Sequence, residues 1–582
     1  MADLRLDRVS FIVLRHMRTP FIVLVCVYAV AMVGMVSIPG LPDENGNPTY
    51  MSFFHAYYFL AYTATTTGFG ELPIAFSNAQ RMWAVVCLYV SVVSWLYGIG
   101  KIIALIKNPH LQSAIEEVRF IRAVRKKRKD YYLVCGFGDT GSILLRSMTD
   151  MGLSAVVLDE DIERIKALSL RDYRIKVLGL CADASIPRFL QYAGVERKEC
   201  IGVLILSNDE EANLKVTISA RLLRPDIKII CRSTIEENEG EILGVGGDTH
   251  IVDPFRVFSS YLSMMIYNPV IHTLNEWLSG DLRVHLGQNM GPLKGRWILC
   301  GHGRMGKIVY KKLTEKNIDV TVIEPLVGKI TEIPGHAILG RANKNNFEKA
   351  GIDDCIGIIA GTDSDTFNLS MIHQANKMNP LLFSIARQNQ HNNEVLFNKA
   401  NVDYIMQPSL VISRMVLFTL TAPLLKHFFS YLRKLFENDP PQLAMIINRL
   451  DNNVGGQKPL TKSYVLTAKT ASAVYQLLEE EKQVTLGDIY KDPTDKKKML
   501  KAVPIAHKRG KVIKIMPKDD LALVQGDEIL FCMRKGVEIL LESTMSNEYT
   551  LHYLMTGQDL PRGLFFCWLN SSGMYKKLIR NS

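Results

Sequence analysis

The sequence has few cysteines. There are ten in 582 residues, and none lies in a Cys-x-x-Cys pair or in a Cys/His cluster with the spacing of a zinc site. This excludes a disulfide-rich scaffold and a zinc-ribbon protein, and it indicates reduced thiols that face the cytosol. Charged residues make up 22% and apolar residues 48% of the chain, so it is neither disordered nor immersed mostly in lipid. The net charge of +11 fits either a nucleic-acid partner or the cytoplasmic face of a membrane.

Long uncharged runs are also scarce. Residues 19–38 and 82–100 contain no charged side chain, and after Lys101 no comparable run occurs. A run of about 20 residues is roughly 30 Å long as a helix, which matches the hydrocarbon core of a bilayer. A signal peptide has a shorter apolar region and accounts for only one such run. The sequence therefore predicts two membrane spans.

Lysine and arginine are missing between these two runs, since residues 39–80 contain neither. Basic residues lie outside both runs: Arg5, Arg8, Arg15 and Arg18 before the first, and Lys101, Lys107 and residues 125–129 after the second. The positive-inside rule then places both termini in the cytoplasm of a cell-membrane protein. We expect an interfacial helix over residues 1–18 and a basic linker over residues 108–130 that faces lipid headgroups or solvent and binds no nucleic acid.

The segment between the spans is too apolar for a simple loop. After a turn at residues 39–47, residues 53–73 read FFHAYYFLAYTATTTGFGELP, of which the part up to about Thr65 has the length of a helix. We expect this segment to enter the membrane and return without crossing it. A pore that strips water from a cation must present backbone carbonyl oxygens at fixed spacing, and alternating glycines permit the backbone that this requires. Non-helical backbone at this depth must be buried or line water.

Residues 66–71 (Thr-Thr-Gly-Phe-Gly-Glu) resemble the potassium-channel selectivity filter, whose usual form is T-V-G-Y-G-D. Phe69 takes the place of the family's tyrosine and lacks the hydroxyl that braces the filter. The resemblance implies that K⁺ binds the hydroxyl of Thr66 and four carbonyls, and that four chains meet around one axis as a homotetramer. The filter residues that it assigns are Thr66, Thr67, Gly68, Phe69 and Gly70.

No span carries a series of arginines, which excludes voltage sensing through such a helix. Gating must therefore come from elsewhere. Gly98 and Gly100 lie near the inner end of the second span, where a hinge would help the pore to open. Close packing of helices accounts for these glycines equally well.

A nucleotide-binding pattern follows the linker. Residues 131–135 form an apolar strand, the next six residues read Gly-Phe-Gly-Asp-Thr-Gly, and a second strand ends at an acid 23 residues after the first glycine. This order is typical of a dinucleotide fold, in which the glycines let a pyrophosphate approach a helix N-terminus and the acid accepts hydrogen bonds from ribose. The residues assigned are Gly136, Gly138, Gly141 and Asp159.

The same pattern returns 165 residues later. Its assigned residues are Gly301, Gly303, Arg304, Gly306 and Glu324. Residues 201–214 match residues 356–369 at an offset of 155, and paired prolines match at an offset of 154. An ordered series of matches with a slowly shrinking offset indicates a duplication. The sequence therefore predicts two Rossmann-like α/β domains.

In each repeat the paired prolines bracket a very apolar segment, residues 255–268 and 409–422. Each segment is either an ordinary core helix or a crossover helix that clasps a neighbouring domain. Together with the two fingerprints, these segments resemble RCK (regulator of potassium conductance) domains, and residues 516–531 resemble the β-rich C-terminal lobe of that family. The resemblance implies a ring of eight such domains in four chains, since residues 101–135 contain no methionine from which separate soluble copies could start.

We therefore expect the following division of the chain. An α-helical pore domain covers residues 19–107 and the basic linker residues 108–130. A first RCK domain covers residues 131–290, and a second with the C-terminal lobe covers residues 291–582. Each RCK domain is expected to have a parallel sheet and a crossover helix.

The two repeats differ at the fourth position of the glycine loop. RCK domains often carry arginine there, and the second repeat has Arg304, whereas Asp139 in the first puts a like charge beside a pyrophosphate. We therefore expect the second repeat to be the better candidate for nucleotide binding than the first. Asp159 and Glu324 favour an unphosphorylated ribose and hence NAD, ADP or another adenine nucleotide.

Further residues are open to two interpretations. Asp183 and Arg341 fall where RCK domains contact the adenine or its partner ring, but a role at a strand end explains them equally well. The acidic residues 209–211 and 236–239 could hold Ca²⁺, but acids at helix N-termini explain them better.

The function that these features favour is a nucleotide-gated potassium channel, with K⁺ as the permeant ion and membrane lipid as its surroundings, rather than an enzyme. A membrane-tethered NAD-dependent oxidoreductase is an alternative, but the sequence contains no recognisable substrate domain or Tyr/Lys or His/Asp catalytic set. A regulatory subunit of a potassium transporter is another, but such a subunit has no reason to carry its own pore segment.

Overall fold

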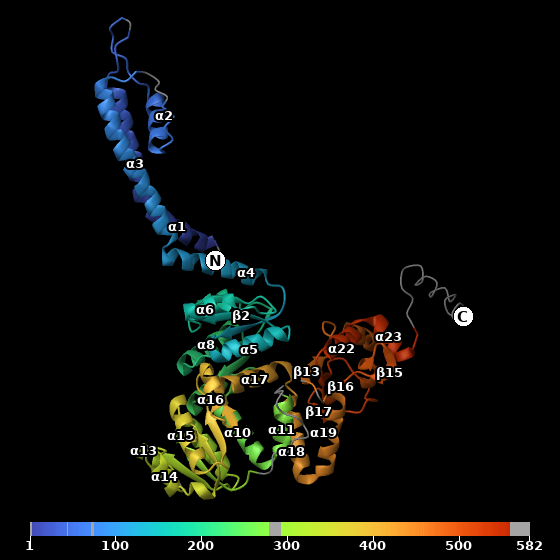
Figure 1. The fold of residues 1–582 in the computed structure, drawn as a ribbon. Coiled ribbons are helices and arrows are strands. Elements are labelled where there is room, and N and C mark those ends of the chain that lie inside the picture. Colours follow the sequence, from blue (N-terminus) through green and yellow to red (C-terminus); the bar gives the residue numbers. More distant parts are fainter. Residues whose placement is uncertain are drawn as a thin grey trace, which may run out of the picture.

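The computed structural model describes residues 3–43, 45–70, 75–278, 293–333, 335–455, 457 and 459–558. Two long helices stand above a globular part, and a helix lies across the junction between them (Figure 1). The globular part contains two α/β repeats and a C-terminal lobe. The expected division at residues 290 and 291 lies outside the described residues.

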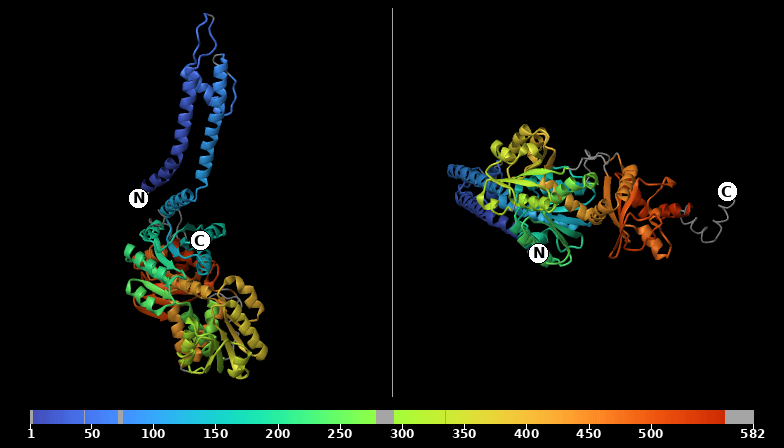
Figure 2. Two further views of the ribbon diagram at one scale, coloured as in Figure 1. Left: turned by 90° about the vertical axis from the view of Figure 1, so that its left-hand side faces the viewer. Right: turned by 90° about the horizontal axis from the view of Figure 1, so that it is seen from below.

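The two long helices are α1 (Asp3–Ser37) and α3 (Asn78–Ile106). Residues 13–37 and 78–106 are long and apolar enough to cross a membrane, with mean hydropathies of 2.3 and 1.8. The two predicted spans are thus present, side by side in both views of Figure 2. However, α1 continues through Pro20, so its residues 3–18 are not a helix separate from the span. The two helices touch closely, because a Cβ on Gly34 would lie 2.1 Å from the Trp83 ring.

A short helix, α2 (Phe53–Ala64), lies beside α1 and α3 at the end away from the globular part (Figure 1). It begins where the Ser52 hydroxyl accepts a hydrogen bond from the His55 amide at 3.3 Å, a typical N-cap. Ala56 and Leu60 are fully buried against α1 and α3. At twelve residues, or about 18 Å, α2 is too short to cross a bilayer. This agrees with the expected re-entrant segment.

The first α/β repeat is a six-stranded parallel sheet with the order β3-β2-β1-β4-β5-β6. Its strands are apolar and largely buried, as is typical of a sheet covered by helices on both faces. The strands are β1 (Tyr131–Cys135), β2 (Ser154–Asp159), β3 (Leu178–Cys181), β4 (Cys200–Ile205), β5 (Lys228–Arg232) and β6 (Thr249–Val252). The helices are α5 (Asp139–Asp150), α6 (Ile162–Leu170), α7 (Pro187–Tyr192), α8 (Glu210–Leu223) and α9 (Glu236–Gly244).

The second repeat has the same topology, β9-β8-β7-β10-β11-β12. Both sheets also share one irregularity: the register shifts beside Ile201 in β4 and beside Ile356 in β10, which are 155 residues apart. The duplication seen in the sequence is therefore preserved down to a β-bulge. The strands are β7 (Arg296–Cys300), β8 (Val320–Glu324), β9 (Ala337–Leu339), β10 (Cys355–Ala360), β11 (Phe383–Arg387) and β12 (Tyr404–Met406). The helices are α12 (Arg304–Thr314), α13 (Val327–Ile330), α14 (Lys344–Lys349), α15 (Asp365–Met378) and α16 (Glu394–Lys399).

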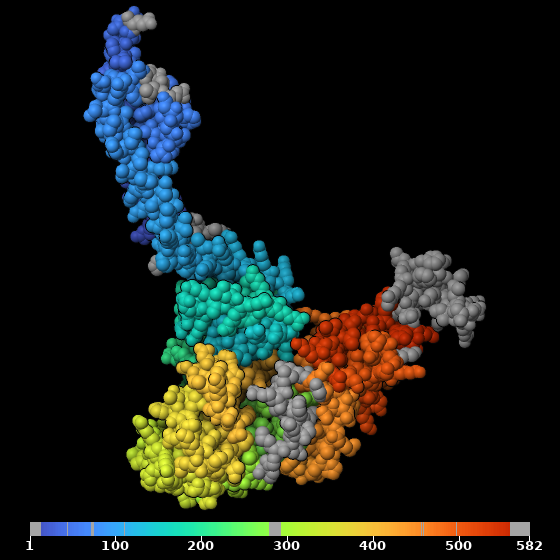
Figure 3. All heavy atoms as spheres, viewed as in Figure 1, coloured from blue at the N-terminus to red at the C-terminus, as the bar shows by residue number. Residues whose placement is uncertain are grey.

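Each repeat sends a helix into the other. Helix α10 (Pro254–Tyr267) follows the first sheet but packs on α12, with Phe258 in a core that contains Trp297. Helix α17 (Pro408–Thr421) follows the second sheet but packs on α5, with Val416 in a core that contains Leu144. The structure therefore shows that both apolar segments are crossover helices. Figure 3 shows that the first repeat (teal) and the second repeat (yellow) pack closely against each other.

Two further helices turn back from the crossover helices, α11 (Pro269–Leu278) and α18 (Leu425–Asn438). The bent pair α17 and α18 is apolar enough to count as a third span. Its side chains, however, lie in the cores of the globular part, as Val416 and Phe428 show. We therefore assign two spans.

The C-terminal lobe contains an antiparallel sheet with the order β13-β18-β16-β17, which agrees with the expected β-rich lobe. Gly526, with φ of +81°, lies in the turn before β18. Burial raises the pKa of the next residue, Asp527, but hydrogen bonds from Arg509 and His507 outweigh this and hold it at about 2. The elements are α19 (Pro440–Val454), β13 (Pro459–Val465), α20 (Ser472–Glu479), α21 (Leu486–Ile489), β14 (Lys491–Asp492), β15 (Asp495–Met499), β16 (Ala502–Arg509), β17 (Val512–Ile515), β18 (Glu528–Arg534), α22 (Val537–Ser546) and α23 (Glu548–Thr556).

The exchange of crossover helices can be tested by Phe258→Ala. Phe258 is fully buried in the core of the repeat that it does not belong to by sequence. We expect the substitution to destabilise the second repeat by about 3–5 kcal/mol, because it leaves a cavity in a packed core. The control is Leu339→Ala on the exposed edge of the same repeat. Protection of the β7 amides from hydrogen exchange should fall for the first variant only, and protection at the wild-type level would contradict the exchange.

Candidate functional site

The backbone after α2 has an alternating conformation. Thr66, Gly68 and Gly70 all have positive φ angles, of 57°, 64° and 69°. In a regular strand successive carbonyls point to opposite sides, whereas left-handed residues at every second position turn them toward one side. A non-glycine residue with positive φ is uncommon, so Thr66 is held there by its surroundings. The segment can therefore present a row of carbonyl oxygens.

The same segment is tied to the end of α2. The amides of Thr67 and Gly68 donate to the Tyr62 carbonyl at 3.0 and 3.4 Å, and the Thr65 and Thr67 hydroxyls lie 2.9 Å apart. The Phe69 ring meets the Tyr62 ring edge to face, with centroids 6.5 Å apart. Phe69 is otherwise exposed. In addition, the negative end of the α2 dipole is directed at this segment, which favours cations.

Gly98 and Gly100 lie within α3, which is continuous at both positions. A Cβ built on either glycine meets no atom of the described chain within 4 Å. Packing inside one chain therefore does not require glycine at these positions, and a role in gating remains a prediction.

The glycine loop of the first repeat is pinned by Asp159 at the end of β2. Its carboxylate accepts hydrogen bonds from the Phe137 amide at 2.5 Å and the Asp161 amide at 2.9 Å. Gly136, with φ of +99°, turns the chain, and a Cβ on Gly141 would lie 2.3 Å from the Gly136 carbonyl oxygen. Loop and helix thus touch where only glycine fits.

The glycine loop of the second repeat is held in the same way, by Glu324 at the end of β8. Glu324 accepts hydrogen bonds from the His302 amide at 2.6 Å and the Leu326 amide at 3.0 Å. A Cβ on Gly306 would lie 2.1 Å from the Gly301 carbonyl oxygen. Both predicted fingerprints therefore form the loop that a dinucleotide fold needs.

A cavity of about 780 Å³ opens at the first fingerprint. Of the residues predicted there, Gly136, Gly138, Asp159 and Asp183 line it, whereas Gly141 lies behind the loop. The second repeat also contributes to its wall, through Arg304, Arg387 and Asn389. The cavity is thus shared between the two repeats, whose crossover helices α10 and α17 pack into each other's domain.

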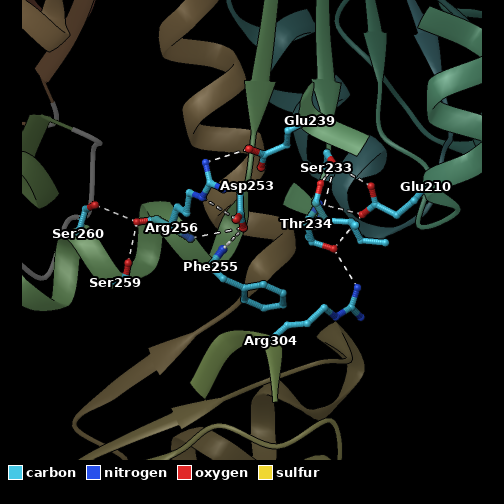
Figure 4. A network of polar contacts seen from close by, with 11 residues as sticks. Glu210, Ser233, Thr234, Glu239, Asp253, Phe255, Arg256, Ser259, Ser260 and Arg304 are labelled. Carbon is cyan, nitrogen blue, oxygen red and sulfur yellow. Dashed lines mark hydrogen bonds and ion pairs between the residues drawn. The ribbon is translucent and has the colours of Figure 1, made fainter. Parts of the chain in front are cut away.

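Three arginines meet at this junction. Arg304 reaches from the second repeat and donates to the Thr234 hydroxyl of the first at 2.9 Å (Figure 4). Burial lowers the pKa of Arg232, Glu210 opposes this, and the charges of Arg304 and Arg387 lower it further. Guanidinium groups nevertheless stay charged. Arg387 pairs with Asp363 at 2.6 Å, whereas Arg304 and Arg232 add positive charge to the cavity wall, which suits phosphate groups.

The junction is held in place by Glu210 at the start of α8. Its carboxylate accepts hydrogen bonds from the Ser233 hydroxyl at 2.8 Å and from the Thr234 amide and hydroxyl at 2.9 and 2.8 Å (Figure 4). Thr234 in turn receives Arg304. Glu210 thus fixes the position of Thr234, the residue of the first repeat that Arg304 of the second repeat contacts.

The second fingerprint lines a smaller cavity of about 220 Å³, with Gly301, Gly303, Arg304 and Glu324 in its wall. Arg304 and Arg387 also line the larger cavity. The sequence favoured the second repeat because of Arg304, but the folded chain directs this side chain toward the first. Gly306 and Arg341 line neither cavity. The Arg341 guanidinium lies 6.0 Å from the centre of the exposed Phe367 ring.

Sequence reasoning missed Arg232 and Arg387 as site residues. Both end equivalent strands, β5 and β11, at the offset of 155. The recurrence of an arginine at equivalent positions of the two repeats was the signal that could have identified them. An arginine at a strand end is, however, also typical of an ordinary surface.

The acidic residues considered for Ca²⁺ have structural roles. Asp209 caps α8 by accepting hydrogen bonds from the Glu211 and Ala212 amides, at 3.0 and 3.1 Å. Glu239 in α9 pairs with Arg256 at 2.9 Å. In the described part of the chain, no group of three or more His, Cys, Asp and Glu residues could hold a metal ion.

Comparison with known families identifies two kinds of domain. The family described as Ion channel matches residues 22–108, and the family described as TrkA-N domain matches residues 132–254 and again residues 297–408. Together these matches cover a little more than half of the chain. They confirm the pore domain and the duplicated α/β fold.

The chain is similar to several archaeal proteins. Potassium channel protein 1 of Methanocaldococcus jannaschii is 23% identical over 38% of this chain and 64% of its own length. Probable potassium channel protein 2 of that organism is 25% identical over 46% of this chain and 75% of its own length. An uncharacterised protein of Methanothermus fervidus is 27% identical over 35% of this chain and 31% of its own length. The chain thus spans less than two thirds of two of these relatives.

Among solved structures, the GsuK channel bound to NAD is 14% identical, with a TM-score of 0.43 over 92% of this chain and 99% of that one. GsuK bound to ADP is 16% identical, with a TM-score of 0.42 over 71% of this chain and 99% of that one.

The tight loop of the first repeat can be tested by Gly141→Ala. The added Cβ would clash with the Gly136 carbonyl, and we expect a cost of about 1–3 kcal/mol, because backbone cannot move aside as a side chain can. The matched control is Gly138→Ala, whose Cβ would meet nothing closer than Arg164 at 3.9 Å. Thermal unfolding of the full chain should begin at a lower temperature for the first variant only. Equal curves for both variants would show that the loop and helix are not in contact.

Proposed function

We propose that this chain, which belongs to the ion channels that join a two-span pore domain to TrkA-N domains, is the subunit of a nucleotide-gated potassium channel. One observation carries the proposal. Between two helices long enough to span a bilayer, α2 leads into a segment in which Thr66, Gly68 and Gly70 alternate with ordinary backbone. Such a segment can replace the water around a K⁺ ion with carbonyl oxygens.

The pore requires four copies of the chain, because each provides one strand of the filter. Two TrkA-N domains in each of four chains supply eight domains for a ring beneath the pore. The absence of Lys and Arg from residues 39–80 supports an external position for the hairpin and a cytoplasmic position for both termini and the ring. Calcium is not part of the proposal, since no group of three or more His, Cys, Asp and Glu residues in the described part of the chain could hold a metal ion, and Asp209 and Glu239 are engaged in a helix cap and an ion pair.

The nucleotide is proposed to occupy the shared cavity of the first repeat. Asp159 and Asp183 would face the ribose and adenine, and the loop from Gly136 would lie along the phosphates. Arg304 and Arg387 would contact the phosphate end from the other repeat, so the site fits an adenine nucleotide such as ADP or NAD. Bound nucleotide would then draw the two repeats together.

A movement of the two repeats toward each other can be transmitted to the pore through a short segment of the chain. The first repeat packs on helix α4 (Pro109–Lys126), which begins two residues after the C-cap Lys107 of α3. A coupling free energy of about 1–3 kcal/mol between nucleotide and gate would change opening roughly 5- to 150-fold. Gly98 and Gly100 are the proposed points at which α3 bends.

The test is ion flux through the purified chain in liposomes. We expect K⁺ to pass faster than Na⁺ and the flux to change when ADP or NAD is added. Equal passage of both ions, or none under any nucleotide, would overturn the channel assignment. Measuring NADH oxidation in the same liposomes separates this function from that of an oxidoreductase, since turnover without K⁺ flux would favour the enzyme.

The shared site predicts which substitutions weaken nucleotide binding. Arg304→Gln should lower the affinity for ADP about tenfold to a hundredfold, because a hydrogen bond from a charged donor contributes about 1.5–3 kcal/mol. Equilibrium binding to the full chain measures this change. Arg341→Gln removes an arginine that lines neither cavity and should leave the affinity unchanged.

A second variant identifies the repeat. Lys329 lines the smaller cavity only, so Lys329→Gln should leave the affinity unchanged if the nucleotide binds in the first repeat. A loss equal to that of Arg304→Gln would instead place the nucleotide in the second repeat.

A further inference from the structure

Helix α4 lies between the membrane helices and the first repeat (Figures 1 and 2). Helix α3 has 29 residues and is therefore about 43 Å long, more than the roughly 30 Å of a hydrocarbon core. Its last turns must extend beyond that core. Helix α4 begins at Pro109, directly after α3. The two-span topology of the proposed function therefore places it near the depth of the lipid headgroups.

One face of α4 is occupied by the first repeat. Leu111, Phe120, Ile121 and Val124 are buried, and the last three belong to the same core as Leu180 and Leu190. The end of the helix is held as well, since Arg197 donates to the Arg125 and Lys127 carbonyls at 3.1 and 2.9 Å. The apolar face of α4 is thus unavailable to lipid, and the helix moves with the first repeat.

The opposite face is exposed and basic. Its cations are Arg119, Arg122, Arg125 and Lys126, followed by Arg128 and Lys129. Among the residues that the structure describes, none of these six forms an ion pair with an acid. Glu116 and Glu117 are the acids on the helix itself, so the face keeps a clear positive excess.

The neighbouring end of α1 carries charge of the same sign. It contacts α4, and its Arg15 and Arg18 are exposed. Lys101 and Lys107 extend the positive charge onto α3. Cations thus lie on all three helices, and α1 and α3 both contact α4.

We propose that the exposed face of α4, with the adjoining end of α1, binds the headgroups of anionic phospholipids. This proposal rests on the two-span topology of the proposed function. The partner follows from charge and position, since juxtamembrane basic clusters attract anionic lipid, and the attraction falls off within a Debye length of the surface. A nucleic acid would need this face to be open to solvent, whereas α1 and α3 lead from it into the bilayer.

Headgroup binding has a consequence for the gate. The same helix is fixed to the first repeat on one side and joined to α3 by a two-residue turn. A lipid that holds α4 against the membrane therefore limits how far the first repeat can pull on α3. We expect the response to nucleotide to depend on the fraction of anionic lipid.

The test compares lipid retention by two variants of the full chain with equal charge. The first combines Arg119→Gln, Arg122→Gln and Lys126→Gln. The control combines Lys349→Gln, Lys377→Gln and Lys399→Gln, which removes three exposed lysines of the second repeat. Native mass spectrometry of detergent-solubilised protein counts the bound phosphatidylglycerol and phosphatidylcholine. We expect the first variant to retain less than a third of the phosphatidylglycerol that wild type and control retain.

Several outcomes would overturn the proposal: equal retention by both variants, no preference for phosphatidylglycerol over phosphatidylcholine, or loss of RNA binding by the first variant with lipid unchanged. A further variant carries Arg119→Lys and Arg122→Lys with Lys126 unchanged, so that the charge of the face is kept. It should retain phosphatidylglycerol as wild type does, which separates a binding defect from misfolding. Because retention is counted without ion flux, the proposal can fail or succeed independently of conduction. In liposomes, the nucleotide response should differ between the two lipids for wild type and control only.

Discussion

The constraint on which the pore depends is that backbone polar groups in a membrane must find partners within the protein or in a water-filled space. Helices α1, α2 and α3 satisfy it internally. The segment of residues 65–70 does so only in part, through the amides of Thr66, Thr67 and Gly68, which donate to carbonyls at the end of α2. The carbonyl oxygens of this segment remain on a backbone that turns them to one side. In the proposed channel, a cation is the partner that completes them.

The globular part depends on a different arrangement, the exchange of crossover helices. Each repeat alone has a parallel sheet with one face short of a helix, and each is completed by α10 or α17 from the other. The same exchange accompanies the shared cavity, to which Arg304 and Arg387 of the second repeat contribute beside the first fingerprint. The packing of the repeats and the proposed nucleotide site therefore depend on the same arrangement. Headgroup binding at α4 would add a second input at the point where this unit meets the membrane.

Much of this could be predicted from the sequence, and the exceptions have physical reasons. The spans were found because a bilayer sets both length and composition, whereas the helices that contain them are longer than the uncharged runs: α1 begins at Asp3, and α3 extends from Asn78 to Ile106. The duplication and both fingerprints were found because glycines and acids recur at fixed spacing. The role of the crossover helices was not decided, because a core helix and a clasping helix have the same apolar pattern. Arg232 and Arg387 were missed, since only tertiary packing brings them to Arg304.

The exchange of helices also affects how the chain is made. Leu144 in α5 is followed only about 270 residues later by Val416, the side chain that covers it. At a synthesis rate of about 5–20 residues per second, the first core waits roughly 15–55 seconds for its last helix. The two spans precede the repeats in the sequence, so a nascent chain would meet the membrane before its first core is complete. An α17 helix from a neighbouring polypeptide could then be taken up in place of its own, and crowded ribosomes on one messenger would favour this intertwined product.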